Sequence, residues 1–160
     1  YVPLLMTTPG IGWVLGYTIA AEIGDIARFA SPTKLAGYTG LCPRVYQSGG
    51  KDHRGPLARN GPKYLRGWGL IEAAVHACRH PAYAERYRRT KTRLGRQRGP
   101  KVAQVDLARR LAEAIWHMLS TNQPFAPVPR SLWPRRGPPT EMRHRSEAPP
   151  IPPGPPSRRR

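Results

Sequence analysis

Acidic residues are scarce in this chain of 160 residues. It carries 9 Asp and Glu against 27 Lys and Arg, which gives a formal net charge of +18. An excess of this size describes the partners of a protein rather than its fold, and it favours a polyanion, most commonly nucleic acid. A genome rich in G and C would also raise the Arg content, but it would not remove the acids.

Cysteine and long apolar runs are scarce as well. Cys42 and Cys78 stand alone, so they support neither a zinc site nor a disulfide framework. A reducing cytoplasm is the expected compartment. No apolar run approaches the ~20 residues of a membrane helix, and no signal peptide is visible, so we expect no membrane partner. The chain begins at Tyr1 rather than at Met, which we interpret as a fragment of a longer protein.

A change of composition near Asn122 divides the chain in two. We expect residues 1–123 to form a small, mainly α-helical domain. Residues 124–160 hold twelve of the 20 prolines, eight Arg and almost no aliphatic residues. Such a segment cannot build a core, so we predict a disordered Pro/Arg-rich tail. The closing run of Arg158, Arg159 and Arg160 could touch phosphates, although runs of this kind are more often simply solvated.

Apolar spacing predicts several helices around one long Gly-rich loop. The expected helices span residues 13–23, 32–38, 63–80, 82–94 and 101–119, with the loop at 40–62, which has room for a short hairpin. Ser31 and Pro32 are typical of a helix start, and Gly24 of a helix end. The predicted buried face of helix 63–80 consists of Leu65, Trp68, Ile71, Val75 and Cys78. That of helix 101–119 consists of Leu107, Leu111, Ile115 and Leu119.

Residues 4–24 match the pattern of a helix-hairpin-helix. The pattern is Leu5-x3-Pro9-Gly10-Ile11-Gly12-x6-Ile19. Two glycines permit a tight turn, after which the second helix presents free N–H groups that suit a phosphate. Such a unit grips the sugar-phosphate backbone without reading sequence, so Gly10 and Gly12 are candidate DNA-binding residues. An ordinary helix turn with a glycine hinge would produce the same pattern.

Ser48 is the candidate nucleophile of the polar loop, within Gln47-Ser48-Gly49-Gly50. The following glycines would let a large substrate backbone approach its hydroxyl. Nearby cations could stabilise charge on an attacked phosphate; they are Arg44, Lys51, Arg54 and Arg59. From the local sequence alone, a flexible turn explains this segment better than a catalytic site does.

Two basic stretches follow the loop. Lys63 and Arg66 are three residues apart, which predicts a shared helical face suited to phosphate. The segment 79–101 holds nine Lys or Arg and one acid, Glu85. Its candidate nucleic-acid contacts are Arg86, Arg88, Arg89, Lys91, Arg93 and Lys101. Tyr83 and Tyr87 could stack on bases, but core packing explains them better. We find no metal-ligand spacing and no phosphate-binding Gly-rich loop, so we expect this chain to bind no metal or cofactor.

The order of the motifs is more specific than any one of them. The series is Pro9-Gly10-Ile11-Gly12, Glu22-Ile23-Gly24-Asp25, Arg28-Phe29, Leu35-Ala36-Gly37-Tyr38-Thr39-Gly40-Leu41, Gln47-Ser48-Gly49-Gly50, Leu65-Arg66 and Ala108-Arg109-Arg110-Leu111-Ala112. It closely resembles the C-terminal domain of the insertion-sequence one-hundred-ten family transposases, which use a structured bridge RNA. The resemblance covers about Leu4 to Leu119.

The resemblance implies a mechanism. In that family an N-terminal RuvC-like domain binds Mg²⁺ through an acidic tetrad, and the helical domain carries a serine nucleophile, which here corresponds to Ser48. The implied reaction forms a phosphoserine link to DNA and releases a 3′ hydroxyl. Without the RuvC-like domain, this chain alone is expected to be inactive.

The implied partners are DNA of the element ends and target, a structured guide RNA, and further copies of the full-length protein, in the bacterial cytoplasm at the nucleoid. Two alternatives stay open. The first is a non-catalytic helix-hairpin-helix module left after truncation. The second is a basic RNA-binding protein of the ribosomal kind.

Overall fold

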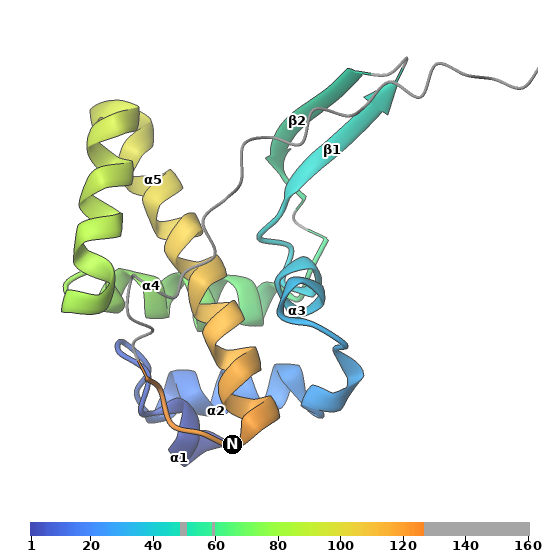
Figure 1. The fold of residues 1–160 in the computed structure, drawn as a ribbon, viewed down its shortest axis with the longest axis vertical. Coiled ribbons are helices and arrows are strands. Elements are labelled where there is room, and N and C mark those ends of the chain that lie inside the picture. The colour runs from blue at the N-terminus through green and yellow to red at the C-terminus, as the bar shows by residue number, and fades with distance from the viewer. Residues whose placement is uncertain (49–50, 59, 127–160) are drawn as a thin grey trace, which may run out of the picture. The chain divides into compact units, whose positions relative to one another are not determined.

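Helices dominate the part of the chain that the computed structural model describes, residues 1–48, 51–58 and 60–126, with backbone alone over 45–48 and 51–54. Short helices come first: α1 (Val2–Leu5), α2 (Trp13–Ile23), the 3-10 turn η1 (Ile26–Arg28) and α3 (Pro32–Tyr38). The strands β1 (Pro43–Ser48) and β2 (Lys51–Leu57) follow, and then η2 (Tyr64–Ile71), α4 (Glu72–Ala77) and α5 (Pro81–Thr121) (Figure 1). The predicted mainly α-helical class is confirmed. The predicted tail lies outside the described residues from 127 onward.

Local capping signals set the boundaries of the first helices. The Ser31 hydroxyl accepts a hydrogen bond from the Lys34 N–H at 3.3 Å, and Pro32 occupies the first helical position of α3. Helix α2 ends at Gly24, which adopts a positive φ of 61°. Both signals were predicted from the sequence and both are confirmed.

The predicted loop 40–62 contains an antiparallel hairpin. Strands β1 and β2 pair from Pro43 opposite Leu57 to Ser48 opposite Lys51, with an irregularity near the base. Below the strands, the Ala58 N–H donates to the Cys42 carbonyl at 2.9 Å. At Gly61, a Cβ would lie 2.3 Å from the Tyr38 carbonyl oxygen, so only glycine permits this approach of backbone to backbone. The hairpin that the loop had room for is therefore present, and its base is closely packed.

The expected buried face of helix 63–80 is confirmed at Leu65 and at the partly buried Ile71 and Cys78, but it is wrong at Trp68 and Val75. Residues 64–71 form a π-helix, whose i→i+5 hydrogen bonds widen the turn and displace the apolar face. Leu65 and Leu70, five residues apart, are both buried, whereas Trp68 is 70% exposed and Val75 is 38% exposed. The buried residues of η2 and α4 are Leu65, Gly69, Leu70, Ala73, Ala74 and Ala77. A spacing of three or four residues between buried positions was therefore the wrong period for η2.

Helix α5 consists of two arms that meet at a kink. Gly95 has non-helical angles, φ 76° and ψ 177°, and the chain reverses its direction near this point (Figure 1). We call residues 81–94 the first arm and residues 96–121 the second arm. The kink falls within the segment 95–100 that was predicted to break the helix. At Gly99, a Cβ would lie 2.3 Å from the Lys91 carbonyl oxygen, so the two arms nearly touch beside the kink.

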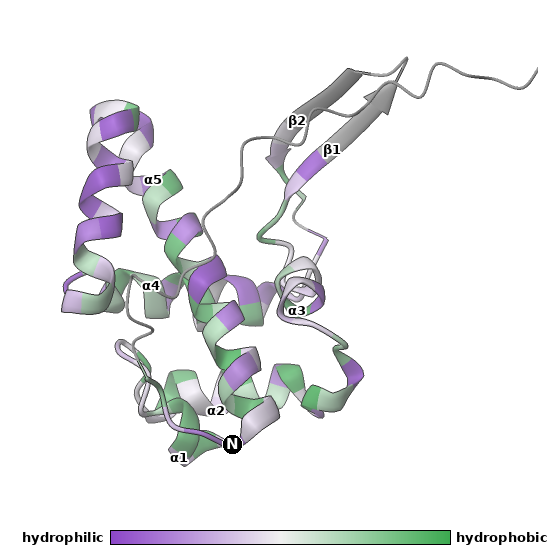
Figure 2. Ribbon diagram, viewed as in Figure 1, coloured by the Kyte–Doolittle hydropathy of each residue, from purple (hydrophilic) through white to green (hydrophobic). Residues whose placement is uncertain are grey.

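The core forms around the second arm of α5. Its predicted apolar stripe is confirmed, because Leu107, Leu111, Ile115 and Leu119 are all buried. They join one cluster with buried residues of the other helices, including Leu5, Ile19, Ile23, Leu35, Leu41 and Leu65. Hydropathy colouring shows green residues along this arm, whereas the first arm is largely purple (Figure 2).

Packing continues just past the expected boundary at residue 123. The Phe125 ring lies 6.0 Å from the Tyr83 ring, and the Phe125 N–H donates to the Thr7 hydroxyl at 2.9 Å. The end of the helical domain is thereby attached both to the first arm of α5 and to the turn after α1.

We predict that Gly99→Ala destabilises the fold, because a methyl group there would meet the Lys91 carbonyl and push the arms apart. Overpacking of this kind lowers the free energy of unfolding by about 1–3 kcal/mol. Gly37→Ala is the matched control, since a Cβ at that exposed helical position meets nothing within 4 Å. It should raise stability by about 0.5 kcal/mol. Denaturant unfolding measures both, and equal stability of the two variants would contradict the close approach.

We also predict a loss of stability at alkaline pH that depends on Tyr83. Burial raises the pKa of Tyr83 to about 12 from 10.0, although the positive charge of Arg110 opposes this shift. The folded state therefore holds the phenol proton more tightly than the unfolded state. The resulting stability is fully present below pH 10 and is lost between pH 10 and about 12. Urea unfolding of Tyr83→Phe across this range should show a shallower decline, while the exposed Tyr17→Phe control should follow the wild type.

Candidate nucleic-acid interface

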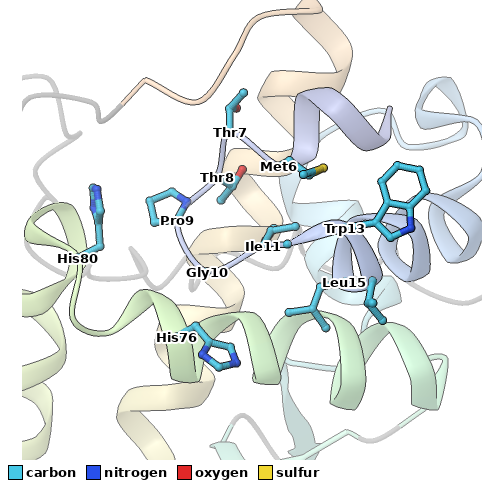
Figure 3. A pocket seen from close by; sticks show the side chains of 12 residues that line it. Met6, Thr7, Thr8, Pro9, Gly10, Ile11, Trp13, Leu15, His76 and His80 are labelled. Carbon is cyan, nitrogen blue, oxygen red and sulfur yellow. The ribbon is translucent and has the colours of Figure 1, made fainter.

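The turn between α1 and α2 presents a helix N-terminus. Gly12 precedes α2 and provides no capping side chain, so the first N–H groups of that helix are open to an acceptor. Gly10, with φ 85°, packs against α4, where a Cβ would lie 2.5 Å from the Ala73 carbonyl oxygen. Figure 3 shows this turn above His76 and beside His80, and these residues line an open hollow together. Gly10 therefore seats the turn, and Gly12 lies on its exposed side.

Ser48 is the last residue of strand β1. The register places Lys51 directly opposite Ser48 and Arg54 opposite Val45. The structure thus brings the backbones of the predicted nucleophile and of two predicted cations into one hairpin. Arg59, a further predicted contact, lies outside the described residues.

Arginines lie at the base of the hairpin. The exposed Arg44 donates from Nε and Nη2 to the Ala58 carbonyl, at 3.4 and 3.3 Å. The half-buried Arg66 donates from Nη1 to the Gly61 carbonyl at 3.4 Å. Lys63 immediately precedes η2 and is exposed. Lys63 and Arg66 were expected to share one open face, but they differ in burial, because Arg66 also fastens the loop at Gly61.

Arg86 has a partner within the fold. Its Nε and Nη2 donate to the two carboxylate oxygens of Asp106 at 2.6 and 2.9 Å. This bidentate pair joins the two arms of α5, and both side chains are about two-thirds buried. Arg86 therefore stabilises the packing of the two arms of α5 against each other. Its role as a nucleic-acid contact stays a prediction.

The exposed cations of α5 gather around the kink. We call this set the basic tip; its members are Arg88, Arg89, Lys91, Arg93, Arg96, Arg98 and Lys101, all exposed. Arg96 and Arg98 were not selected from the sequence, although they belong to the same basic run. The basic run is visible in the sequence. Arg96 and Arg98 were not selected from it because they fall between the two predicted helices 82–94 and 101–119.

Arg28 is a further residue that was not selected from the sequence. It ends η1, is exposed, and stacks on the rings of Phe29 and Tyr38. No periodic pattern marks it, because Tyr38 is ten residues away and reaches Arg28 only through the fold.

The described residues offer no metal site and no membrane-spanning helix. No group of three or more His, Cys, Asp or Glu among them is arranged to hold a metal ion. Among the described helices, none is both long and apolar enough to cross a membrane.

Comparison with known proteins identifies the family to which the chain belongs. The family model described as "Transposase IS116/IS110/IS902 family" matches residues 2–89, from α1 into the first arm of α5. The chain belongs to this family of insertion-sequence transposases, which confirms the family predicted from the sequence. Its placement as the C-terminal domain of such a transposase stays a prediction.

The chain is similar to several curated relatives. A probable family 20 transposase of Pseudomonas aeruginosa is 30% identical, over 77% of this chain and 36% of the relative. A pilin gene-inverting protein of Moraxella bovis is 32% identical, over 76% of this chain and 38% of the relative. The transposase for insertion sequence element IS1111A of Coxiella burnetii is 29% identical, over 76% and 33%. The chain thus spans about a third of the length of these relatives.

We predict that the basic tip binds DNA through phosphates. Replacing Arg89, Lys91 and Arg93 by Gln should weaken binding to duplexes of unrelated sequence alike, because phosphate contacts carry no sequence information. The slope of log K against log salt should fall by about 0.9 for each phosphate that the variant no longer neutralises. Fluorescence anisotropy at several salt concentrations measures both, with the exposed Thr92→Ala as the control on the same arm. An unchanged salt slope in the triple variant would place the DNA elsewhere.

Proposed function

We propose that this chain is the DNA-handling part of a transposase or site-specific recombinase, and that Ser48 is its nucleophile. The observation that carries the proposal is the strand register, in which Ser48 ends β1 directly opposite Lys51. Family membership supports the reaction class. A strand end followed by two glycines offers a hydroxyl to a bulky substrate without a neighbouring Cβ to hinder its approach.

The proposed reaction is a transfer of a phosphodiester to serine. The Ser48 hydroxyl gives up its proton, its oxygen bonds to phosphorus, and the bond from phosphorus to the 3′ oxygen breaks. The departing 3′ oxygen takes up a proton and leaves as a hydroxyl. The phosphate keeps its charge, and no electrons are gained or lost overall. Lys51 would stabilise the charge that builds on the attacked phosphate.

The described residues do not supply a metal site for this reaction, since they hold no cluster of carboxylates. We therefore assign no step to a metal ion bound by this chain. Any Mg²⁺ that activates the reaction would be held by a RuvC-like segment outside it.

The grip on DNA is proposed to be independent of sequence. Gly12 opens the N-terminus of α2 in the manner of a helix-hairpin-helix, and the basic tip contacts further phosphates. Because neither feature reads base edges, recognition of a target would require another component. A structured guide RNA and further copies of the full-length protein are the partners that this proposal includes.

A non-catalytic nucleic-acid-binding module is the second candidate function. It is favoured by one observation, that the open helix N-terminus and the basic tip are complete without Ser48. Such a module would bind DNA as tightly with Ser48 replaced, and it would form no covalent adduct. Binding alone therefore does not distinguish the two functions, and the test must follow strand exchange.

The test uses a chimaera of the Moraxella bovis pilin gene-inverting protein in which residues 1–126 of this chain replace the matching segment. With Ser48 intact, we expect inversion of the pilin segment in cells and a covalent protein–DNA species after denaturing electrophoresis. Ser48→Ala should abolish both, a loss of at least about a thousandfold, since no other group would replace the nucleophile.

Ser120→Ala is the matched control, because Ser120 is an exposed serine on α5. It should leave inversion unchanged. If the chimaera inverts DNA equally well with Ser48→Ala, then Ser48 is not the nucleophile. If inversion fails while DNA binding persists in every variant, the chain is better described as a binding module.

A further inference from the structure

The guanidinium of Arg28 is held by two aromatic rings. Its Cζ lies 4.8 Å from the centroid of Phe29 and 4.7 Å from that of Tyr38. The two rings are themselves in contact, with centroids 5.2 Å apart and planes tilted by 55°. A cation over a ring face is attracted by the ring quadrupole, so this pair forms a seat for the arginine.

The seat is fixed to the core. Phe29 is buried, and its carbonyl accepts a hydrogen bond from the Trp116 indole N–H at 2.8 Å. Tyr38 is the last residue of α3 and packs against the core cluster. Arg28 itself stays exposed. The rings therefore hold an exposed cation in one place without burying it.

No acid within the described part of the chain neutralises Arg28. The neighbouring Asp25 caps η1, and its Oδ1 accepts from the Ala27 N–H at 2.9 Å. On the facing helix α5, Glu113 is paired with Arg110 at 2.7 Å. A stacked guanidinium keeps its N–H donors in its own plane, so those of Arg28 remain available for an anion.

The seat adjoins the base of the β-hairpin. The chain continues from Tyr38 through Gly40 into β1, and Gly61 on the returning segment packs directly on Tyr38 and Thr39. Arg66 lies at the same place, since its Nη1 would be 3.3 Å from a Cβ on Gly40. Arg44 follows at the start of β1, hydrogen-bonded to Ala58. Three arginines, each held by a contact of its own, thus follow one short stretch of backbone.

We propose that Arg28, Arg44 and Arg66 form a clamp for the phosphates of DNA at the base of the hairpin. The inference rests on the proposed function, because the clamp would position the strand that Ser48 attacks. From Arg44 to Ser48 the strand covers four steps, or about 13 Å, so the clamp contacts phosphates other than the attacked one. Arg28 is therefore a positioning residue. Pre-ordered arginines lose little side-chain entropy when they bind, and their planar fork matches a phosphate.

The first test measures binding of a short fluorescein-labelled DNA duplex to the whole chain by anisotropy. Arg28→Ala should weaken binding about tenfold, as expected for a charge-assisted hydrogen bond, and should lower the salt slope by about one. Lys34→Ala is the matched control, since it removes one exposed cation from the neighbouring helix α3. It should weaken binding less than twofold. Thermal unfolding confirms that each variant is folded.

Three further variants separate the effect of the aromatic rings from the effect of the charge. Arg28→Lys keeps the charge but loses the planar fork, so it should recover the salt slope without recovering the affinity. Tyr38→Leu keeps Arg28 but removes one ring, so it should weaken binding several-fold at an unchanged salt slope. Tyr38→Phe keeps the ring and should bind as the wild type does.

The outcomes distinguish this inference from the proposed function. Equal effects of Arg28→Ala and Lys34→Ala would overturn the clamp while leaving the role of Ser48 intact. A specific effect of Arg28→Ala supports the clamp even where Ser48→Ala proves active in strand exchange. A loss seen with a structured RNA but not with the DNA duplex would overturn DNA as the occupant, and a wild-type chain that binds no DNA would overturn both proposals.

Discussion

Burial of the apolar stripe on the second arm of α5 is the constraint on which the rest of the structure depends. Leu107, Leu111 and Ile115 are almost completely buried. Fully burying a side chain of this size contributes about 1.5–3 kcal/mol. The same helix contacts α1, η1, α3, α4 and η2, whereas α2 packs against α1 and η2. Because α1, α2 and α3 are short, their stability must come from packing against neighbouring helices rather than from their own helix propensity.

Two of the segments assigned a function are attached to the rest of the fold where backbone meets backbone at a glycine. Gly10 packs the α1–α2 turn against α4, and Gly61 packs the base of the hairpin against the end of α3. Within the basic tip itself, Gly99 brings the two arms of α5 together at Lys91. A side chain at any of the three glycines would force the neighbouring backbone to move. The contacts of Gly10 and Gly61 lie at the base of their segments, so the parts proposed to meet DNA can project from the fold while their attachment stays defined.

Local signals predicted from the sequence were confirmed where neighbouring residues decide the outcome. Ser31 and Pro32 begin α3, and the stripe containing Leu107 is buried, because caps and a regular 3.6-residue period act within a few residues. The prediction failed at Trp68, since η2 is a π-helix, which changes the period, and the spacing of apolar residues did not indicate one. Contacts between residues far apart in the sequence could not be predicted either. The Arg86–Asp106 pair and the stacking of Arg28 on Tyr38 join residues that only the fold brings together.

For the candidate site, the sequence was sufficient to select residues but not to predict how they are arranged. Ser48, Lys51 and Arg54 were selected from a segment interpreted as a loop, and the register of the strands then related them to one another. Resemblance to a family, rather than local pattern, is what favoured Ser48. Its chemical role stays a prediction.

The distribution of the few acids explains how one small fold can be both stable and strongly cationic. On the second arm of α5, Asp106 and Glu113 are paired with Arg86 and Arg110 near the core. At such partly buried places an unpaired charge would be costly, so the available carboxylates stabilise the junctions between arms and turns. Few acids remain to balance the basic tip, and its cations repel one another across the kink. That repulsion opposes folding, and a polyanion that binds the tip would relieve it, so affinity for nucleic acid and the cost of excess charge have the same physical origin.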